Sequence, residues 1–457
     1  MSAHRALNRF GLGARPDESR ADADPRGWLE SQLASEPERR PTPEGTEDPG
    51  SLLRAQLAAS RTGDEAETRE VRRRIGAHVT ADAVDGLTAR VAADRPFLER
   101  WVAFWSNHLC VGAGAKVPTR LLAGAYEREA IRPFVLGPFE TLLLEATRHP
   151  AMITYLDNVR SVGPDSPAAR RRGRRADTPV GLNENHAREL LELHTLGVDG
   201  GYGQDDVREL ARILTGWTVS GLGGAVGALR GEANGRAAFS FEPLVHDPGE
   251  KTVLGRRYAE SGVAEGEQVI RDLARHPSTA RFLATKLVRH FVADDPPAAA
   301  VDRLAGRFTE TEGDLREVAR EVIHLEEAWA PDHLKFRTPQ DWLVAVLRGL
   351  GLRQAPPTLL GVLRDLRQPL WSPASPKGFD DTTDVWADPD GLLNRAEFAR
   401  TVARTVSRRS RVDDPVRLAA LVEREAGDPL HAILRDDAVA TDERVALAFA
   451  DPRFQWR

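Results

Sequence analysis

The stretch of sequence that decides the fold is residues 183–197, which read NENHARELLELHTLG. Its leucines recur at helical spacing, and Gly197 supplies a typical helix stop. At about 100° per residue, Leu190, Leu191 and His194 share one face of this segment. We therefore expect a helix that packs its leucines against an apolar core.

Polar residues crowd the other sides of the predicted helix. Arg188 has a glutamate one turn away in each direction, and a ladder of exposed ion pairs explains this set. A second line runs through Asn185, Glu189 and Glu192 at i, i+4 and i+7, and leucines flank its carboxylates. Buried carboxylates need a cation, a metal or a shifted pKa. The candidate catalytic residues are therefore Glu189, Glu192, Arg188 and Asn185.

Composition extends the helical prediction to the whole chain. The 457 residues are rich in Ala, Leu, Arg and Glu and contain only 4 Tyr and 2 Met, so strong helix formers outnumber good strand formers. Helical periodicity covers roughly 51–77, 82–110, 265–293, 313–327 and 338–352, and strand character is confined to 237–242 and 252–258. We predict a predominantly all-α fold: a single large helical domain over 51–457 with long loops and at most a small β-hairpin, preceded by a helical lead-in and loop over 1–50.

Charge and segment lengths exclude several classes of protein. The net charge of -6 gives no basic signature of nucleic-acid binding. No apolar run approaches the ~20 residues that span a bilayer, and the first ten residues lack the apolar stretch of a signal peptide. The single cysteine, Cys110, excludes an intramolecular disulfide and a multi-cysteine metal site. We expect a soluble protein, cytoplasmic as written, with no nucleic-acid or membrane partner; its substrate and oligomeric state are left open.

Three long loops interrupt the helical pattern, at 160–182, 220–250 and 371–390. Long loops inside a helical domain are uncommon and are often functional. The first holds five arginines between Arg170 and Arg175, a run that is more often a solvated loop than a nucleic-acid arm.

Two further sets of polar residues are candidates for a site. Trp101, Trp105 and His108 fall at i, i+4 and i+7, which is typical of core, but the histidine at the end of the stripe is placed to reach a cavity. His246 and Asp247 are adjacent in a loop.

Lys286 and His290 also lie one helical turn apart, just before a proline-containing turn. We interpret this pair as a cationic last turn that the helix dipole favours, and not as part of a site.

These residues together resemble a known family. The segment 183–197, with the runs at 104–108, 155–158 and 214–217, resembles the bacterial family called domain of unknown function 1800. Further matching residues are His246, Asp247, Lys251, the run 284–287 with Phe291, and the run 375–378. The resemblance covers nearly the whole chain and implies a fold but no mechanism. Position 186 is His where the family typically has Tyr, and members are often exported, so the resemblance leaves the localisation open.

Three hypotheses for function follow, and the favoured one is a metal-dependent enzyme. Its ligands to a divalent metal would be His108, Glu189, His194, His246 and Asp247. Imidazole and carboxylate donors without thiolate suit iron, manganese, zinc or copper, and an open position would activate water or dioxygen. Glu189 and Glu192 cannot both bind the same ion as His194 unless the end of the helix is distorted, which the nearby Gly197 permits.

The second hypothesis is a metal-free acid–base enzyme that acts on a sugar or peptide. It would use two carboxylates in a cleft lined by Trp101, Trp105 and Trp217. The third is a non-catalytic binding or scaffold protein, in which a buried polar network around 183–188 holds the fold. Whether the chain is an enzyme stays open at this point.

Overall fold

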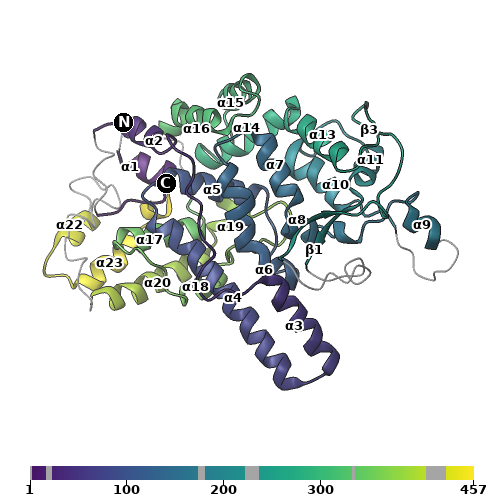
Figure 1. The fold of residues 1–457 in the computed structure, drawn as a ribbon. Helices are drawn as coiled ribbons and strands as arrows, with labels where there is room; N and C mark the ends of the chain where they lie inside the picture. The colour runs from purple at the N-terminus through teal and green to yellow at the C-terminus, as the bar shows by residue number, and fades with distance from the viewer. Residues whose placement is uncertain (1–2, 17–22, 173–180, 222–235, 332–334, 408–428) are drawn as a thin grey trace.

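The computed structural model of the chain describes residues 3–16, 23–172, 181–221, 236–331, 335–407 and 429–457 (Figure 1). Within these ranges the chain is mainly helical, which confirms the predicted fold class. The first long helices are α3 (Pro49–Thr62), α4 (Glu65–Ala92) and α5 (Pro96–His108). In Figure 1, α3 and part of α4 form a hairpin that projects from the rest of the molecule.

Capping residues decide where these three helices begin and end. Gly63 ends α3 in the left-handed conformation, at φ +69°, and the carboxylate of Asp64 then accepts from the first amides of α4. Pro96 begins α5 at a position where its missing amide is harmless. The helices predicted over 51–77 and 82–110 were therefore wrongly divided. Local caps set the breaks at 63–64 and 93–95, where the apolar period gives little signal.

Most of the remaining chain between the two ends is also helical. Its α-helices are α1 (Ala3–Arg5), α2 (Pro25–Ser31), α6 (Val117–Tyr126), α7 (Phe139–Arg148), α8 (Pro150–Tyr155), α9 (Pro167–Arg172), α10 (Asn185–Glu189), α11 (Gln204–Leu214), α13 (Val263–Ala274), α14 (Pro277–Phe291), α15 (Ala298–Glu310), α16 (Leu315–His324), α17 (Pro339–Gly349), α18 (Leu359–Asp365), α19 (Thr383–Trp386), α20 (Pro389–Ser407), α22 (Pro429–Arg435) and α23 (Thr441–Ala450). Wider π-helical turns are η1 (Ala6–Phe10), η2 (Glu127–Ile131) and η5 (Leu190–Thr195). Short 3₁₀ turns are η3 (Arg132–Phe134), η4 (Asn158–Arg160), η6 (Glu326–Trp329) and η7 (Arg453–Gln455). None of the helices in the described ranges is long and apolar enough to cross a membrane.

Within the described ranges, four short strands form two antiparallel pairs, one pair more than the single hairpin expected. Strand β1 (Trp217–Ser220) pairs with β2 (Ala238–Phe241), and β3 (Lys251–Val253) pairs with β4 (Arg256–Tyr258). Residues 254 and 255 both have positive φ, as a tight two-residue hairpin turn requires.

The main apolar core gathers around α5. Trp101 and Trp105 are fully buried in it, and the ring of Phe10 packs against those of Phe97 and Phe291. The N-terminal segment is thus built into the same core as the helices that follow.

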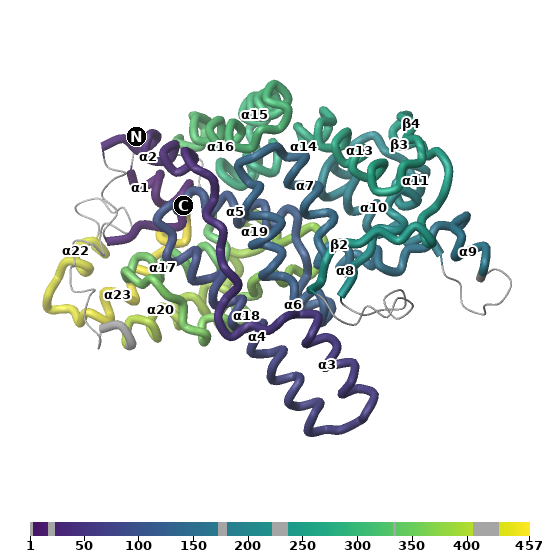
Figure 2. The backbone as a smooth tube through the Cα atoms, in the orientation of Figure 1, coloured from purple at the N-terminus to yellow at the C-terminus, as the bar shows by residue number. Residues whose placement is uncertain are grey.

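A second apolar cluster lies beside the first, between α17, α18, α20 and α23. Figures 1 and 2 show α20 and α23 next to each other in this part of the molecule. The two ends of the chain meet nearby, where the guanidinium of Arg457 donates to the carbonyl of Arg9 at 3.2 Å. Lys335 and Arg457 also exchange backbone hydrogen bonds.

The predicted helix at 183–197 forms, but its second half is wound more widely than an α-helix. It begins as α10 and continues as the π-helical turn η5, in which the amide of Leu196 donates to the carbonyl of Leu191, five residues earlier. Gly197 stops the segment at φ +82°, as the sequence indicates. Such π-turns are rare and often occur at functional sites.

Replacement of Trp101 tests the main core. Trp101→Ala removes a fully buried ring and leaves the carbonyl of Val135 without its 2.8 Å donor. We expect the free energy of unfolding to fall by about 3–5 kcal/mol, measured by chemical denaturation. Leu57→Ala on the projecting hairpin, where the side chain is 48% exposed, should change it by about 0.5 kcal/mol or less. Equal effects of the two substitutions would contradict this assignment of the core.

His186 and His194 make the fold sensitive to acid. Burial lowers the pKa of His186 from 6.5 to about 4, and burial also lowers the pKa of His194 to about 3, with a smaller contribution from His186. Above pH 6.5 both residues are neutral in the folded and unfolded chain, so they add no pH dependence. Between pH 6.5 and 4 only the unfolded chain binds their protons, so stability falls as the pH falls.

The His186→Phe variant should therefore show a shallower loss of stability between pH 6.5 and 4.5. The slope should decrease by up to about 1.4 kcal/mol per pH unit, the largest contribution of one titrating group. Denaturation curves at several pH values for both proteins measure this difference. Identical slopes would show that His186 is not held neutral in the folded state.

Candidate functional site

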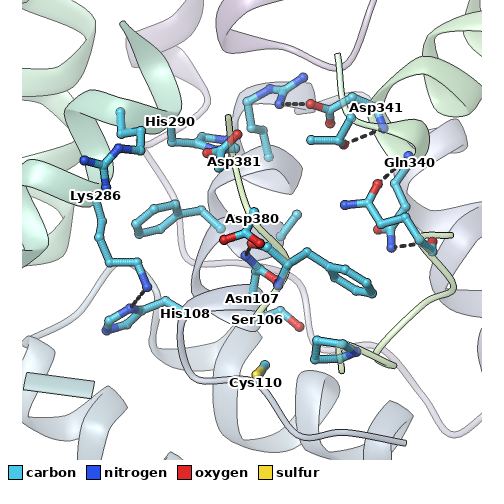
Figure 3. A pocket seen from close by; sticks show the side chains of 18 of the residues that line it. Ser106, Asn107, His108, Cys110, Lys286, His290, Gln340, Asp341, Asp380 and Asp381 are labelled. Atoms are coloured by element: carbon cyan, nitrogen blue, oxygen red, sulfur yellow. Dashed lines mark hydrogen bonds and ion pairs between the residues drawn. The ribbon is translucent and has the colours of Figure 1, made fainter. Parts of the chain in front are cut away.

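A cavity of about 450 Å³ lies among α5, α14, α17 and the segment 371–382. Figure 3 shows many of the side chains that line it. Asn107 and His108 come from the end of α5, Lys286 and His290 from α14, and Asp381 from the segment 371–382. The volume is in the usual range for a small-molecule site.

The segment 371–382 is held tightly against the end of α5. The side-chain amide of Asn107 donates to the carbonyl of Phe379 at 2.9 Å and accepts from its backbone amide at 2.8 Å. Gly378 has φ +84°, and a Cβ there would collide with the carbonyl of Asn107. Only glycine fits this approach, so the wall of the cavity depends on it.

At one end of the cavity a lysine contacts a histidine. Nζ of Lys286 lies 3.0 Å from Nδ1 of His108, and Nε2 of His108 lies 3.1 Å from the carbonyl oxygen of His194 (Figure 3 shows the first contact). A carbonyl only accepts, so Nε2 carries the proton and Nδ1 accepts from Lys286. Burial, aided by the charge of Lys286, holds the pKa of His108 well below its usual value, so the imidazole is neutral.

The π-turn η5 supplies the carbonyl that fixes this histidine. Because the chain leaves the helix at Gly197, no backbone amide of the described ranges bonds to the carbonyl of His194, which accepts from His108. The hydrogen bond selects one imidazole tautomer and thereby presents Nδ1 to the lysine.

Lys286 differs from every other lysine of the chain. The sequence has five lysines, and the other four each bind a carboxylate. The pairs are Lys116–Asp157 at 2.7 Å, Lys251–Glu265 at 2.9 Å, Lys377–Asp380 at 2.9 Å, and Lys335–Asp294. Lys286 has no carboxylate within ion-pair distance in the described ranges; its polar partner is the neutral His108. Burial lowers the pKa of Lys286 from 10.5 to about 8, so this amine loses its proton much closer to neutral pH than an ordinary lysine does.

One turn after Lys286 on α14, a half-buried histidine–aspartate pair also lines the cavity. Nδ1 of His290 contacts the carboxylate of Asp381, and Nε2 has no hydrogen-bond partner among the described residues. Burial lowers the pKa of His290, although Asp381 partly opposes this. Nearby, Asp341 binds Arg100 at 2.9 Å and Arg457 at 3.3 Å. Burial alone would raise the pKa of Asp341, but these two guanidinium groups lower it to about 2.

The predicted catalytic carboxylates lie outside this cavity. Glu189 and Glu192 are half-buried, and Glu192 accepts from the hydroxyl of Tyr202 at 3.4 Å. Burial and the charge of Glu192 raise the pKa of Glu189. Only Leu193, from the same segment, reaches the cavity lining.

Asn185 and Arg188 line a separate, shallow depression on the surface. Arg188 pairs with Glu184 at 3.1 Å and also donates to Gln204 at 3.0 Å. Of the ion-pair ladder expected through Glu184, Arg188 and Glu192, the structure shows the pair with Glu184, and these contacts bring neither Asn185 nor Arg188 to the cavity.

His246 and Asp247 belong to a polar cluster that joins β3 to α11 and α13. Nε2 of His246 lies 2.8 Å from the carboxylate of Glu265, which also binds Lys251 at 2.9 Å. Asp247 binds Arg212 at 2.7 Å. These contacts tie neighbouring elements together and leave both residues engaged.

The five residues predicted to bind a metal are therefore not brought together. His108 and His194 are neighbours, but they meet through a backbone carbonyl, and Nε2 of His194 is buried with no hydrogen-bond partner from the residues that the structure describes. Within the described part of the chain, no three His, Cys, Asp or Glu residues gather in a way that could hold a metal ion. The three tryptophans predicted to line a stacking cleft, Trp101, Trp105 and Trp217, are each at most 1% exposed.

The sequence interpretation missed Lys286 and His290, which it assigned to a cationic last turn of a helix. Both do lie in the last turns of α14, but both also line the cavity. The available signal was composition: a lysine is conspicuous in a chain that has only five among 63 basic residues.

Comparisons with known proteins place the chain in a family. A family model described as a protein of unknown function, DUF1800, matches residues 5–456. Comparisons with curated proteins and with solved structures each found no match. The matched span includes every residue of the cavity and of the helix at 183–197. The chain therefore belongs to the DUF1800 family of proteins of unknown function.

Proposed function

We propose that the chain is an enzyme whose active site is the cavity around Lys286, and that the amine of Lys286 attacks the carbonyl group of a small substrate. The environment of this amine carries the proposal. Its polar partner is a neutral imidazole, no carboxylate of the described ranges forms an ion pair with it, and burial lowers its pKa to about 8. Desolvation of this kind is how proteins make a lysine nucleophilic near neutral pH.

The proposed chemistry needs only the groups of the cavity and the substrate. The lone pair of Nζ forms a bond to the carbonyl carbon while the C=O π bond breaks, and a proton passes from nitrogen to oxygen to give a carbinolamine. Loss of water then gives an imine. His108 acts as a positioning residue, because its Nδ1 accepts one N–H of Lys286 and so directs the nitrogen lone pair elsewhere.

The other hypotheses from the sequence have less support in the arrangement. A metal-dependent reaction stays a prediction, because the donor residues proposed for it are dispersed. Glu189 and Glu192 lie outside the cavity, so an acid–base reaction built on them also stays a prediction. A scaffold role explains the polar cluster around Glu265, but it gives no reason for an unpaired lysine in a cavity.

Reductive trapping tests the proposal directly. We expect acetone with cyanoborohydride to add an isopropyl group to Lys286, detected by peptide mass spectrometry, because the imine is reduced to a stable amine. Lys286→Met should remove this adduct. Lys116→Arg is the matched control, since arginine keeps the charge that binds Asp157. Adducts spread evenly over the five lysines, or absent from Lys286, would refute the proposal.

His108 gives a second test, because its substitution should change the orientation of the Lys286 amine more than the pKa of that amine. His108→Phe removes the acceptor of one hydrogen bond of about 1 kcal/mol, so trapping at Lys286 should slow about fivefold. His108→Gln offers an amide oxygen and should recover part of the rate. Competitive acetylation at varied pH should keep its midpoint near 8 at Lys286 in all three proteins. A midpoint near the ordinary lysine value of about 10.4 in the wild type would contradict the assigned environment.

A further inference from the structure

The charges that line the cavity do not balance. Four carboxylates line it, and each has a cationic or histidine partner. The pairs are Asp294 with Lys335, Asp341 with Arg100 and Arg457, Asp380 with Lys377, and Asp381 with His290. Among the cations of the lining, Arg100 and Lys377 are engaged in these pairs. A third, Arg90, binds Glu127 at 3.2 Å.

Lys286 and Arg289 are the two cations of the lining that remain without a carboxylate partner in the described ranges. Arg289 donates from Nε to the backbone carbonyl of Asp294 at 3.3 Å. Its two terminal NH₂ groups have no hydrogen-bond partner among the residues that the structure describes. The two residues are i and i+3 on α14, so they lie on the same side of the helix. The charge of Arg289 also opposes protonation of Lys286.

Two neighbouring positive charges in a partly desolvated cavity are unfavourable unless an anion joins them. The planar fork of an arginine fits an oxyanion with two parallel N–H···O bonds, which ammonium groups do not provide. The free terminal groups of Arg289 are therefore suited to bind the anionic part of a ligand. Lys286, one turn earlier, is then placed beside the rest of that ligand.

We propose that the substrate is a small carbonyl compound that carries an oxyanion, a carboxylate or a phosphate, which Arg289 binds while Lys286 attacks the carbonyl carbon. The inference rests on the proposed function for the attack by Lys286. The anion-binding part depends only on the charges of the lining, so the two parts are separable by experiment.

Matched pairs of substrates test the role of Arg289. Trapping rates at Lys286 are measured with pyruvate and with methyl pyruvate, which differ by one negative charge, and with dihydroxyacetone phosphate and dihydroxyacetone. We expect Arg289→Gln to lower the rate ratio of the charged to the neutral member about tenfold or more, as loss of charge-assisted hydrogen bonds of 1.5–3 kcal/mol implies. The pair with the larger loss identifies carboxylate or phosphate as the bound group.

Arg281→Gln is the matched control on the same helix. Arg281 is exposed and binds Asp302 at 2.7 Å, away from the cavity lining. Its substitution should leave both ratios unchanged, and Arg289→Lys should restore only part of them, because an ammonium lacks the fork. Ratios in Arg289→Gln that equal those of the wild type would overturn the inference.

A measurement without any carbonyl separates the two proposals. Propionate or inorganic phosphate bound beside Lys286 favours its ammonium form, so the midpoint for acetylation of Lys286 should rise above 8 in the wild type and stay near 8 in Arg289→Gln. No rise with either anion would overturn the anion site. A rise without any trapping of carbonyl compounds would support the anion site and refute the attack by Lys286.

Discussion

The carboxylate of Glu127 is the buried contact on which the frame around the cavity depends. One of its oxygens, Oε2, accepts from Arg90 at 3.2 Å, Ser106 at 2.8 Å and Trp371 at 2.7 Å. Burial alone would raise the pKa of Glu127, but these donors and Arg132 lower it. One ionised group thus joins α4, α5, the π-turn η2 and the segment 371–382. Removal of a partner from such a buried charge is strongly destabilising, so the four elements hold a fixed relation.

This fixed frame allows the cavity to keep an unfavourable charge arrangement. Asn107 and His108 follow Ser106 at the end of α5, so the contact to Glu127 also positions the groups that meet Phe379 and Lys286. A looser structure would move a carboxylate toward the unpaired amine or let water solvate it. Here the neighbouring carboxylates are already engaged, and the amine keeps a depressed pKa.

The sequence predicted the helical fold and the helix at 183–197, because an apolar period of 3.6 is a local property. It did not predict the helix breaks near Gly63 and Pro96. These breaks depend on caps, which rest on a few polar contacts that the apolar pattern does not encode. The π-turn at the end of α10 was outside the same reasoning, which assumes uniform winding. The residues of the functional site were harder to predict than the helix boundaries. Lys286 stands out because no carboxylate of the described ranges pairs with it. The sequence does not reveal this, because ion pairs such as Lys335–Asp294 join residues far apart in the chain.

The near-absence of lysine gives the molecule two separate kinds of positive charge. Arginine supplies all but five of the 63 basic residues and keeps its charge over the range in which Lys286 titrates. The long-range field of the protein is therefore almost constant through mildly alkaline pH, while the amine in the cavity loses its proton. In the proposed reaction, binding of the anionic group by Arg289 and attack on the carbonyl by Lys286 are then controlled by different residues, and selection is able to adjust one without disturbing the other.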